Sequence, residues 1–98
     1  MIKHIVCFKF KPETSPADVQ ATLDALHALP GQIAWVRNWS LGKNVSTRDT
    51  TYDYALHCDF ADESELQRYL SHPAHEQVAR ELLAKHWGSR AIVDYQFG

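Results

Sequence analysis

The sequence lacks the features that mark several large classes of protein. It has no basic run and no glycine-rich phosphate loop, and ten basic against twelve acidic residues leave a formal net charge of −2. Nucleic-acid binding is therefore not expected. No apolar stretch approaches the roughly 20 residues needed to span a bilayer. The polar-interrupted N-terminus "MIKHIVCFKF" also differs from a secretory signal. These absences predict a cytoplasmic protein that contacts no membrane.

Cysteine is scarce as well, with only Cys7 and Cys58, and no CxxC spacing. Both fall in strand-like segments, which favours buried reduced thiols over a disulfide or a zinc site. His72 and His75 could supply two metal ligands, but Pro73 separates their rings and no nearby carboxylate completes a set. We therefore expect neither a metal nor another cofactor.

The composition is that of an ordinary folded protein, with 45% hydrophobic and 22% charged residues. Its 98 residues make a single domain, 1–98. A chain of this length buries only about 60–65% of its unfolded surface. The core is therefore thin, and a partner subunit would add to it.

Alternating and helical hydrophobic patterns divide the chain into strands and helices. Alternation predicts strands over 2–11, 33–41, 52–60 and 91–97. Helix-start signals at Ser15–Pro16, Asp62 with Glu65, and Pro73 predict three helical segments; the first should stop at the "PG" of 30–31 and the last should run to about 85.

This order predicts an α+β fold of the ferredoxin-like β-α-β-β-α-β type, with an antiparallel sheet and helices on one face. The other sheet face then needs a cover. Packing two such sheets face to face in a homodimer, as a dimeric α/β barrel, is the simplest solution. The residues expected on that face are Ile5, Cys7, Ala34, Val36, Ala55 and Val93.

The segment "YLSHPAH" carries the residues that suggest chemistry. Its proline places His72 at the helix N-cap and His75 in the first turn on the apolar face. The helix dipole and burial both disfavour a charged imidazole there, so a neutral His75 could accept a proton. Tyr69 ends the preceding helix on its inner face, and His4 lies on the helix-facing side of the first strand. Taken singly, His75 and Tyr69 are each better explained by core packing than by a function.

The strings "KHIVCFKFK" and "YLSHPAH", with "ALPG", "GKNVS", "YDYALHCDF" and "VDY" between and after them, resemble the stress-responsive A/B barrel family, often called Dabb. The resemblance covers almost the whole chain and implies a ferredoxin-like domain that dimerises into a barrel. Most members have no assigned activity. One relative, olivetolic acid cyclase, closes a linear polyketide by aldol condensation without a cofactor.

By this resemblance, His75 would be a general base, helped by Tyr69 and His4. A tyrosine of the cyclase pocket falls on aliphatic sequence around Leu26 here, so a different substrate is implied. The leading hypothesis is a cofactor-independent cyclase or isomerase acting next to a carbonyl on a polyketide-like or aromatic ligand. Two alternatives stay open: a non-catalytic dimeric stress or ligand-binding protein, and a cofactor-free monooxygenase of a related dimeric barrel.

Overall fold

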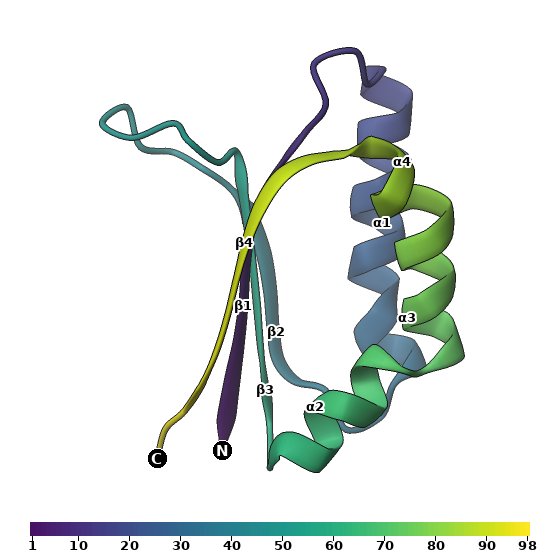
Figure 1. Cartoon of the computed structure of the whole chain (residues 1–98), viewed down its shortest axis with the longest axis vertical. Coiled ribbons are helices and arrows are strands. Elements are labelled where there is room, and N and C mark those ends of the chain that lie inside the picture. The colour runs from purple at the N-terminus through teal and green to yellow at the C-terminus, as the bar shows by residue number, and fades with distance from the viewer.

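Four antiparallel strands form one sheet, and all the helices cover one of its faces (Figure 1). The computed structural model describes residues 1–98. The strands lie in the order β2-β3-β1-β4. Their bounds are β1 (Ile2–Phe10), β2 (Arg37–Lys43), β3 (Tyr54–Phe60) and β4 (Trp87–Gln96). The helical segments are α1 (Pro16–Gln32), α2 (Glu63–Leu70), α3 (Pro73–Val78), η1 (Ala79–Leu83) and α4 (Ala84–His86). The predicted ferredoxin-like order is confirmed.

The alternation in β1 sorts its side chains between the two sheet faces. Ile2, His4, Val6 and Phe8 are buried against the helices, whereas the residues between them lie on the opposite face and are less buried. β1 is central, pairing with β3 on one side and β4 on the other. Residues directly opposite one another in an antiparallel pair share a face. The register therefore decides which β4 side chains face the helices with His4.

The predicted helix starts are confirmed by their caps. The Ser15 hydroxyl accepts a hydrogen bond from the Asp18 N–H, and the Asp62 carboxylate accepts one from the Glu65 N–H. At α3, Nδ1 of His72 accepts from the Ala74 N–H. Each cap satisfies an N–H that the first helical turn leaves without a partner.

The predicted end of the first helix is wrong, because α1 continues through Pro30 and Gly31 to Gln32. Pro inside a helix costs about 3 kcal/mol. Leu29 and Ile33, on either side of it, are fully buried, and full burial of each such side chain is worth about 1.5–3 kcal/mol. Their burial outweighs the cost of the proline in the last turn.

The predicted start of the second strand is also wrong, because β2 begins at Arg37 rather than at 33. Residues 33–36 instead form a turn in which the Val36 N–H donates to the Ile33 carbonyl at 3.2 Å. A register shift follows between Arg37 and Ser40, where Asn38 has a φ of 55°. Ala34 and Val36 therefore do not lie on the open sheet face as expected.

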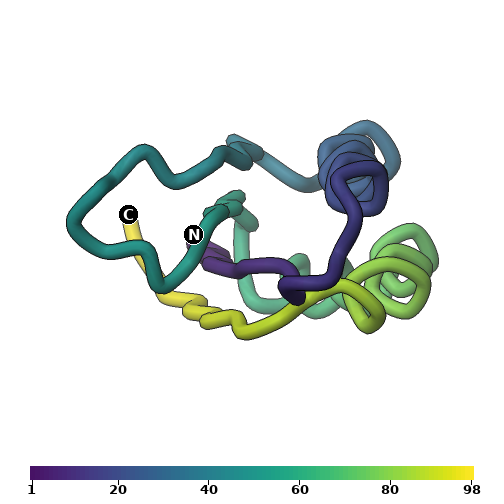
Figure 2. Tube along the Cα trace, turned by 90° about the horizontal axis from the view of Figure 1, so that it is seen from above, coloured from purple at the N-terminus to yellow at the C-terminus, as the bar shows by residue number.

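The face of the sheet away from the helices is open. Of the residues expected there, Ile5 and Cys7 are half-buried, and Ala55 and Val93 are exposed. A long polar loop between β2 and β3 projects on this side, away from the helices, as Figures 1 and 2 both show. The two termini lie together at one end of the sheet, where the Met1 ammonium donates to the Phe97 carbonyl at 3.1 Å.

Candidate functional site

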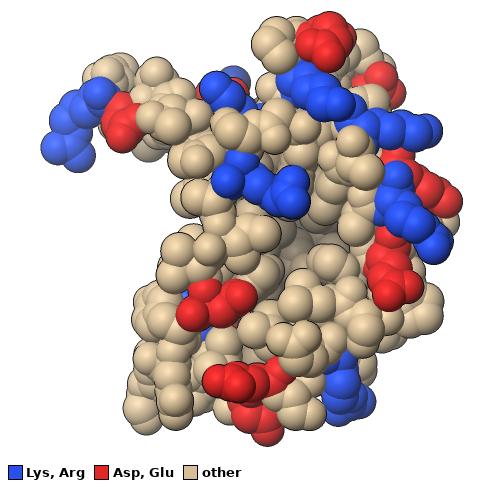
Figure 3. All heavy atoms as spheres, viewed as in Figure 1, with Lys and Arg blue, Asp and Glu red and all other residues tan.

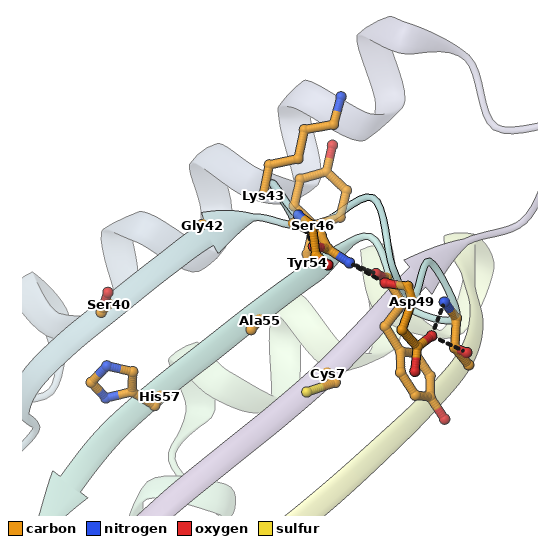
Figure 4. Close-up of a pocket in the computed structure, with 12 residues that line it drawn as sticks. Cys7, Ser40, Gly42, Lys43, Ser46, Asp49, Tyr54, Ala55 and His57 are labelled. Atoms are coloured by element: carbon orange, nitrogen blue, oxygen red, sulfur yellow. Dashed lines mark hydrogen bonds between the residues drawn. The ribbon is translucent and has the colours of Figure 1, made fainter.

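The surface has two hollows that deserve comparison, one on each side of the sheet. The larger, about 640 Å³, lies on the open face under the β2–β3 loop (Figure 4). Cys7 and His57 lie on its floor, and loop residues such as Ser46 and Asp49 form its wall. Most of its lining residues are polar, and none of them is His4, Tyr69 or His75. Size alone therefore does not identify the site.

The second hollow, about 390 Å³, lies on the helical side and contains two of the three predicted residues. We call it the helix-side cavity. Its volume is within the range of small-molecule sites, and most of its lining is apolar. The lining residues are His4, Val6, Leu70, His75, Ala79, Leu83, Ala84, Trp87, Arg90 and Ile92.

His75 lies in this cavity, and a hydrogen bond to the backbone determines which of its ring nitrogens carries the proton. Its Nδ1 is 3.1 Å from the carbonyl oxygen of Leu70, at the end of the preceding helix. A carbonyl oxygen can only accept a hydrogen bond, so Nδ1 carries the proton. In the neutral ring, Nε2 is then the unprotonated nitrogen. Burial lowers the pKa of His75 below its ordinary value of 6.5, against an opposing contribution from the Leu70 hydrogen bond.

Tyr69 is not among the lining residues, but its ring packs against the rings of both histidines. Its ring centroid is 4.6 Å from that of His75 and 5.9 Å from that of His4. Only 2% of the residue is exposed, and Phe60 packs against the ring at 5.1 Å. Burial raises the pKa of the phenol far above its ordinary value of 10, so the hydroxyl keeps its proton and remains a donor. The three predicted residues are thus brought together.

His4 is held by a residue that the sequence did not single out. Asp94 lies directly opposite His4 in the β1–β4 pair, and its carboxylate contacts Nδ1 of the imidazole. The carboxylate accepts a hydrogen bond from Nδ1–H, so in the neutral ring Nε2 is the unprotonated nitrogen. The available sequence signal was alternation in the last strand, predicted over 91–97, which places 92 and 94 on one face. Only the strand register shows that Asp94 reaches His4.

The helix after His75 contains a π-helical turn, η1 (Ala79–Leu83), between α3 and α4. The sequence predicts one regular helix here, and the extra residue in the π turn changes which side chains face the sheet. Ala79, Leu83 and Ala84 line the helix-side cavity, whereas Val78 and Leu82 border a separate hollow beside α1. Single π turns in α-helices occur frequently at functional sites. Here the π turn forms part of the wall of the cavity that contains His75.

The remaining candidate ligands and thiols are dispersed. His72 caps α3, and its ring centroid lies 5.8 Å from that of Trp35. The ring of His72 is therefore not directed to the same place as that of His75. No group of three or more His, Cys, Asp and Glu side chains is arranged to hold a metal ion. Cys7 and Cys58 are both free, and burial raises the pKa of Cys58 to about 12. No helix has the length and apolar character needed to cross a membrane.

Similar proteins agree with this architecture. A protein of Streptomyces coelicolor, named only as uncharacterized, is 37% identical over 99% of this chain and 100% of its own length. A crystal structure from Bacteroides fragilis, named a dimeric protein of unknown function with a ferredoxin-like fold, is 31% identical and has a TM-score of 0.80. That match covers 98% of this chain and 95% of the other.

The fold is also shared with a named enzyme. The hydroxynitrile lyase of Passiflora edulis superposes with a TM-score of 0.88 over 99% of this chain and 93% of its own, at 15% identity. At that identity the likeness shows the fold alone. The family model for the stress-responsive A/B barrel domain matches residues 2–97. Because that match spans nearly the whole chain, this protein belongs to the stress-responsive A/B barrel, or Dabb, family.

Proposed function

We propose that the helix-side cavity catalyses proton abstraction next to a carbonyl group, without a cofactor, in a polyketide-like or aromatic substrate. The observation that carries the proposal is the hydrogen bond from Nδ1 of His75 to the Leu70 carbonyl. It leaves Nε2 unprotonated in the neutral ring, and the lowered pKa of His75 keeps the ring neutral near pH 7. A neutral imidazole in an apolar cavity is suited to act as a general base.

In the proposed step, Nε2 of His75 takes a proton from the carbon next to the substrate carbonyl. The electron pair of that C–H bond forms the enolate, with the charge on the carbonyl oxygen. In isomerisation, the imidazolium returns the proton to another carbon. In cyclisation, the enolate carbon attacks a second carbonyl carbon and the proton goes to the new alkoxide oxygen. Each route restores neutral His75.

Tyr69 and His4 would support the developing charge and position the substrate. The Tyr69 hydroxyl keeps its proton because burial raises its pKa, so it can donate a hydrogen bond to an enolate oxygen. The His4 ring lines the cavity with its Nδ1 held by Asp94. We assign His4 to orienting the substrate or relaying the proton.

The functional unit in this proposal is a homodimer formed through the open sheet face. Only 15 of the 98 residues are buried, which is a thin core for one chain. Val93 and Tyr95, both on the open face of β4, are 55% and 47% exposed. The Bacteroides fragilis relative is named dimeric, as is a structure from Thermobifida fusca. A second sheet packed on this face would cover the exposed apolar side chains.

Deuterium exchange tests the proposed step directly. The protein is incubated with a panel of aryl ketones, including acetophenone, in D₂O, and loss of the α-proton signal is followed by NMR. We expect exchange above the buffer rate for the native protein and loss of that excess in His75→Ala. His27→Ala, on the exposed side of α1, is the matched control. No enzyme-dependent exchange on any ketone, or unchanged exchange in His75→Ala, would contradict the proposal.

A further inference from the structure

One cation lines the helix-side cavity, and it belongs to Arg90 near the start of β4. Arg90 is directly opposite Phe8 in the β1–β4 pair, and Phe8 is fully buried beneath the helices. Residues opposite one another share a sheet face. Arg90 therefore lies on the same side of the sheet as His4 and Asp94.

The guanidinium of Arg90 packs on an aromatic ring but forms no ion pair. It lies over the Trp87 ring, 5.2 Å from the ring centroid, and Trp87 also lines the cavity. Stacking on an aromatic face leaves the N–H groups at the edge of the guanidinium available. None of the three ion pairs in the chain includes Arg90, and the carboxylate of Asp94, on the same strand, is taken by His4.

The rest of the cavity wall carries no acidic side chain to neutralise Arg90, so the charge of Arg90 favours a ligand with an anionic group. No acidic side chain lines the cavity, and apart from the two histidines the other lining residues are apolar. On the face drawn in Figure 3, a hollow lies between the front strand and the helices, with basic atoms at its upper rim. An unpaired guanidinium at the edge of an apolar cavity is suited to bind a carboxylate through two hydrogen bonds.

The placement of Arg90 also gives the expected shape of the ligand. Arg90, Ile92 and Asp94 alternate along one face of β4, so the Cα atoms of Arg90 and Asp94 are about 14 Å apart. Ile92 lies between them on the cavity wall. A ligand with its anionic group at Arg90 and its carbonyl at the histidines would therefore place an apolar spacer along Ile92.

We propose that Arg90 is a specificity-determining residue, and that the substrate of this cavity is a carbonyl compound bearing a carboxylate across an apolar or aromatic spacer. The inference rests on the proposed function, because it names the substrate class of the same cavity. Arg90 binds and orients the carboxylate. It takes no part in the proton transfer.

A matched pair of probes tests the role of Arg90: 4-oxo-4-phenylbutanoate and its methyl ester. Each is titrated into the protein at pH 8, and binding is followed through the NMR signals of the His4 and His75 rings. We expect saturable binding of the acid, at least tenfold tighter than the ester. In Arg90→Gln the affinity for the acid should fall about tenfold or more, while that for the ester should not change.

Arg68→Gln provides the control, because Arg68 is also stacked on a tryptophan, Trp35, at 4.3 Å, but does not line the cavity. It should bind both probes as the native protein does. Absence of saturable acid binding, equal affinity for acid and ester, or an unchanged acid affinity in Arg90→Gln would overturn the inference. If binding depends on Arg90 but the α-protons do not exchange, the role of Arg90 in binding is retained and the proposed catalysis is excluded. Exchange measured on the ester tests catalysis separately.

Discussion

Asp94 on β4 lies directly opposite His4 on β1, and its carboxylate holds Nδ1 of the imidazole. Replacing Asp94 with Asn keeps the shape but allows the amide to donate to Nδ1, which favours the other tautomer of His4. A hydrogen bond to a charged group is worth about 1.5–3 kcal/mol. We expect Asp94→Asn to lower the proton-exchange rate about 10- to 100-fold.

Two measurements separate this positioning role from a structural one. The ¹⁵N NMR signals of His4 should report the change of tautomer, and the KM for a ketone substrate should change much less than kcat. Asp53→Asn, in the exposed β2–β3 loop, is the control. An Asp94→Asn protein with the native His4 tautomer and native rate would exclude the positioning role.

The stability of the protein should depend on pH through His75. The folded-state pKa lies below 6.5 because burial disfavours the charged ring. As the pH falls below 6.5, the unfolded chain binds a proton that the folded chain does not, so the free energy of unfolding decreases. Between the unfolded pKa and the lower folded pKa, acidification should therefore lower Tm.

The variant His75→Gln isolates this contribution, because its amide can still donate to the Leu70 carbonyl but does not titrate. Thermal unfolding of both proteins between pH 7.5 and 5 should show a steeper loss of Tm for the native chain. Parallel curves would mean that His75 has the same pKa in the folded and unfolded states.

The hydroxyl of Tyr69 can be tested apart from its ring. The ring packs between His75, His4 and Phe60, so Tyr69→Phe keeps those contacts. We expect the free energy of unfolding to change by no more than about 1 kcal/mol, while the exchange rate falls because the donor to the enolate oxygen is lost. A native exchange rate in Tyr69→Phe, measured by the same deuterium assay, would show that Tyr69 contributes packing alone.

The open sheet face should form the homodimer interface. Val93 is 55% exposed on the open face of β4, and Val93→Lys would place a charge within the interface. We expect sedimentation to show a dimer for the native chain and a shift toward monomer for this variant. Ala21→Lys, at an exposed position of α1 on the other side of the sheet, should stay dimeric. Equal sedimentation of Val93→Lys and the native protein would place the interface elsewhere.

Local patterns were sufficient to predict the fold. The alternation of β1, the caps at Ser15 and Asp62 and the proline after His72 depend on near neighbours in the chain, and all three are found as expected. One error is at 30–36, where burial of Leu29 and Ile33 overrides the helix-breaking signal of Pro30. Another is the start of the last strand, which begins at Trp87 rather than at 91. Propensity describes a segment alone, whereas burial depends on the completed core.

The candidate site was predictable only in part. His4, Tyr69 and His75 could be assigned to the helix side of the sheet from periodicity, and the structure brings their rings together. Asp94 and Arg90 could not be found, since their positions beside His4 and the cavity depend on the register of β1 with β4. The π turn was not predictable either, because no residue in "ARELL" distinguishes it from a regular helix.

The assignment of His75 as the general base is tested most directly by the tautomer and pKa of its ring, measured by ¹⁵N NMR of the ring nitrogens through a pH titration, with assignment by His75→Gln. We expect a neutral ring protonated on Nδ1 at pH 7, a pKa below 6.5, and signals that shift in Tyr69→Phe. A ring protonated on Nε2, or one that titrates at 6.5 or above and does not respond to Tyr69→Phe, would contradict the assignment of His75 as the general base.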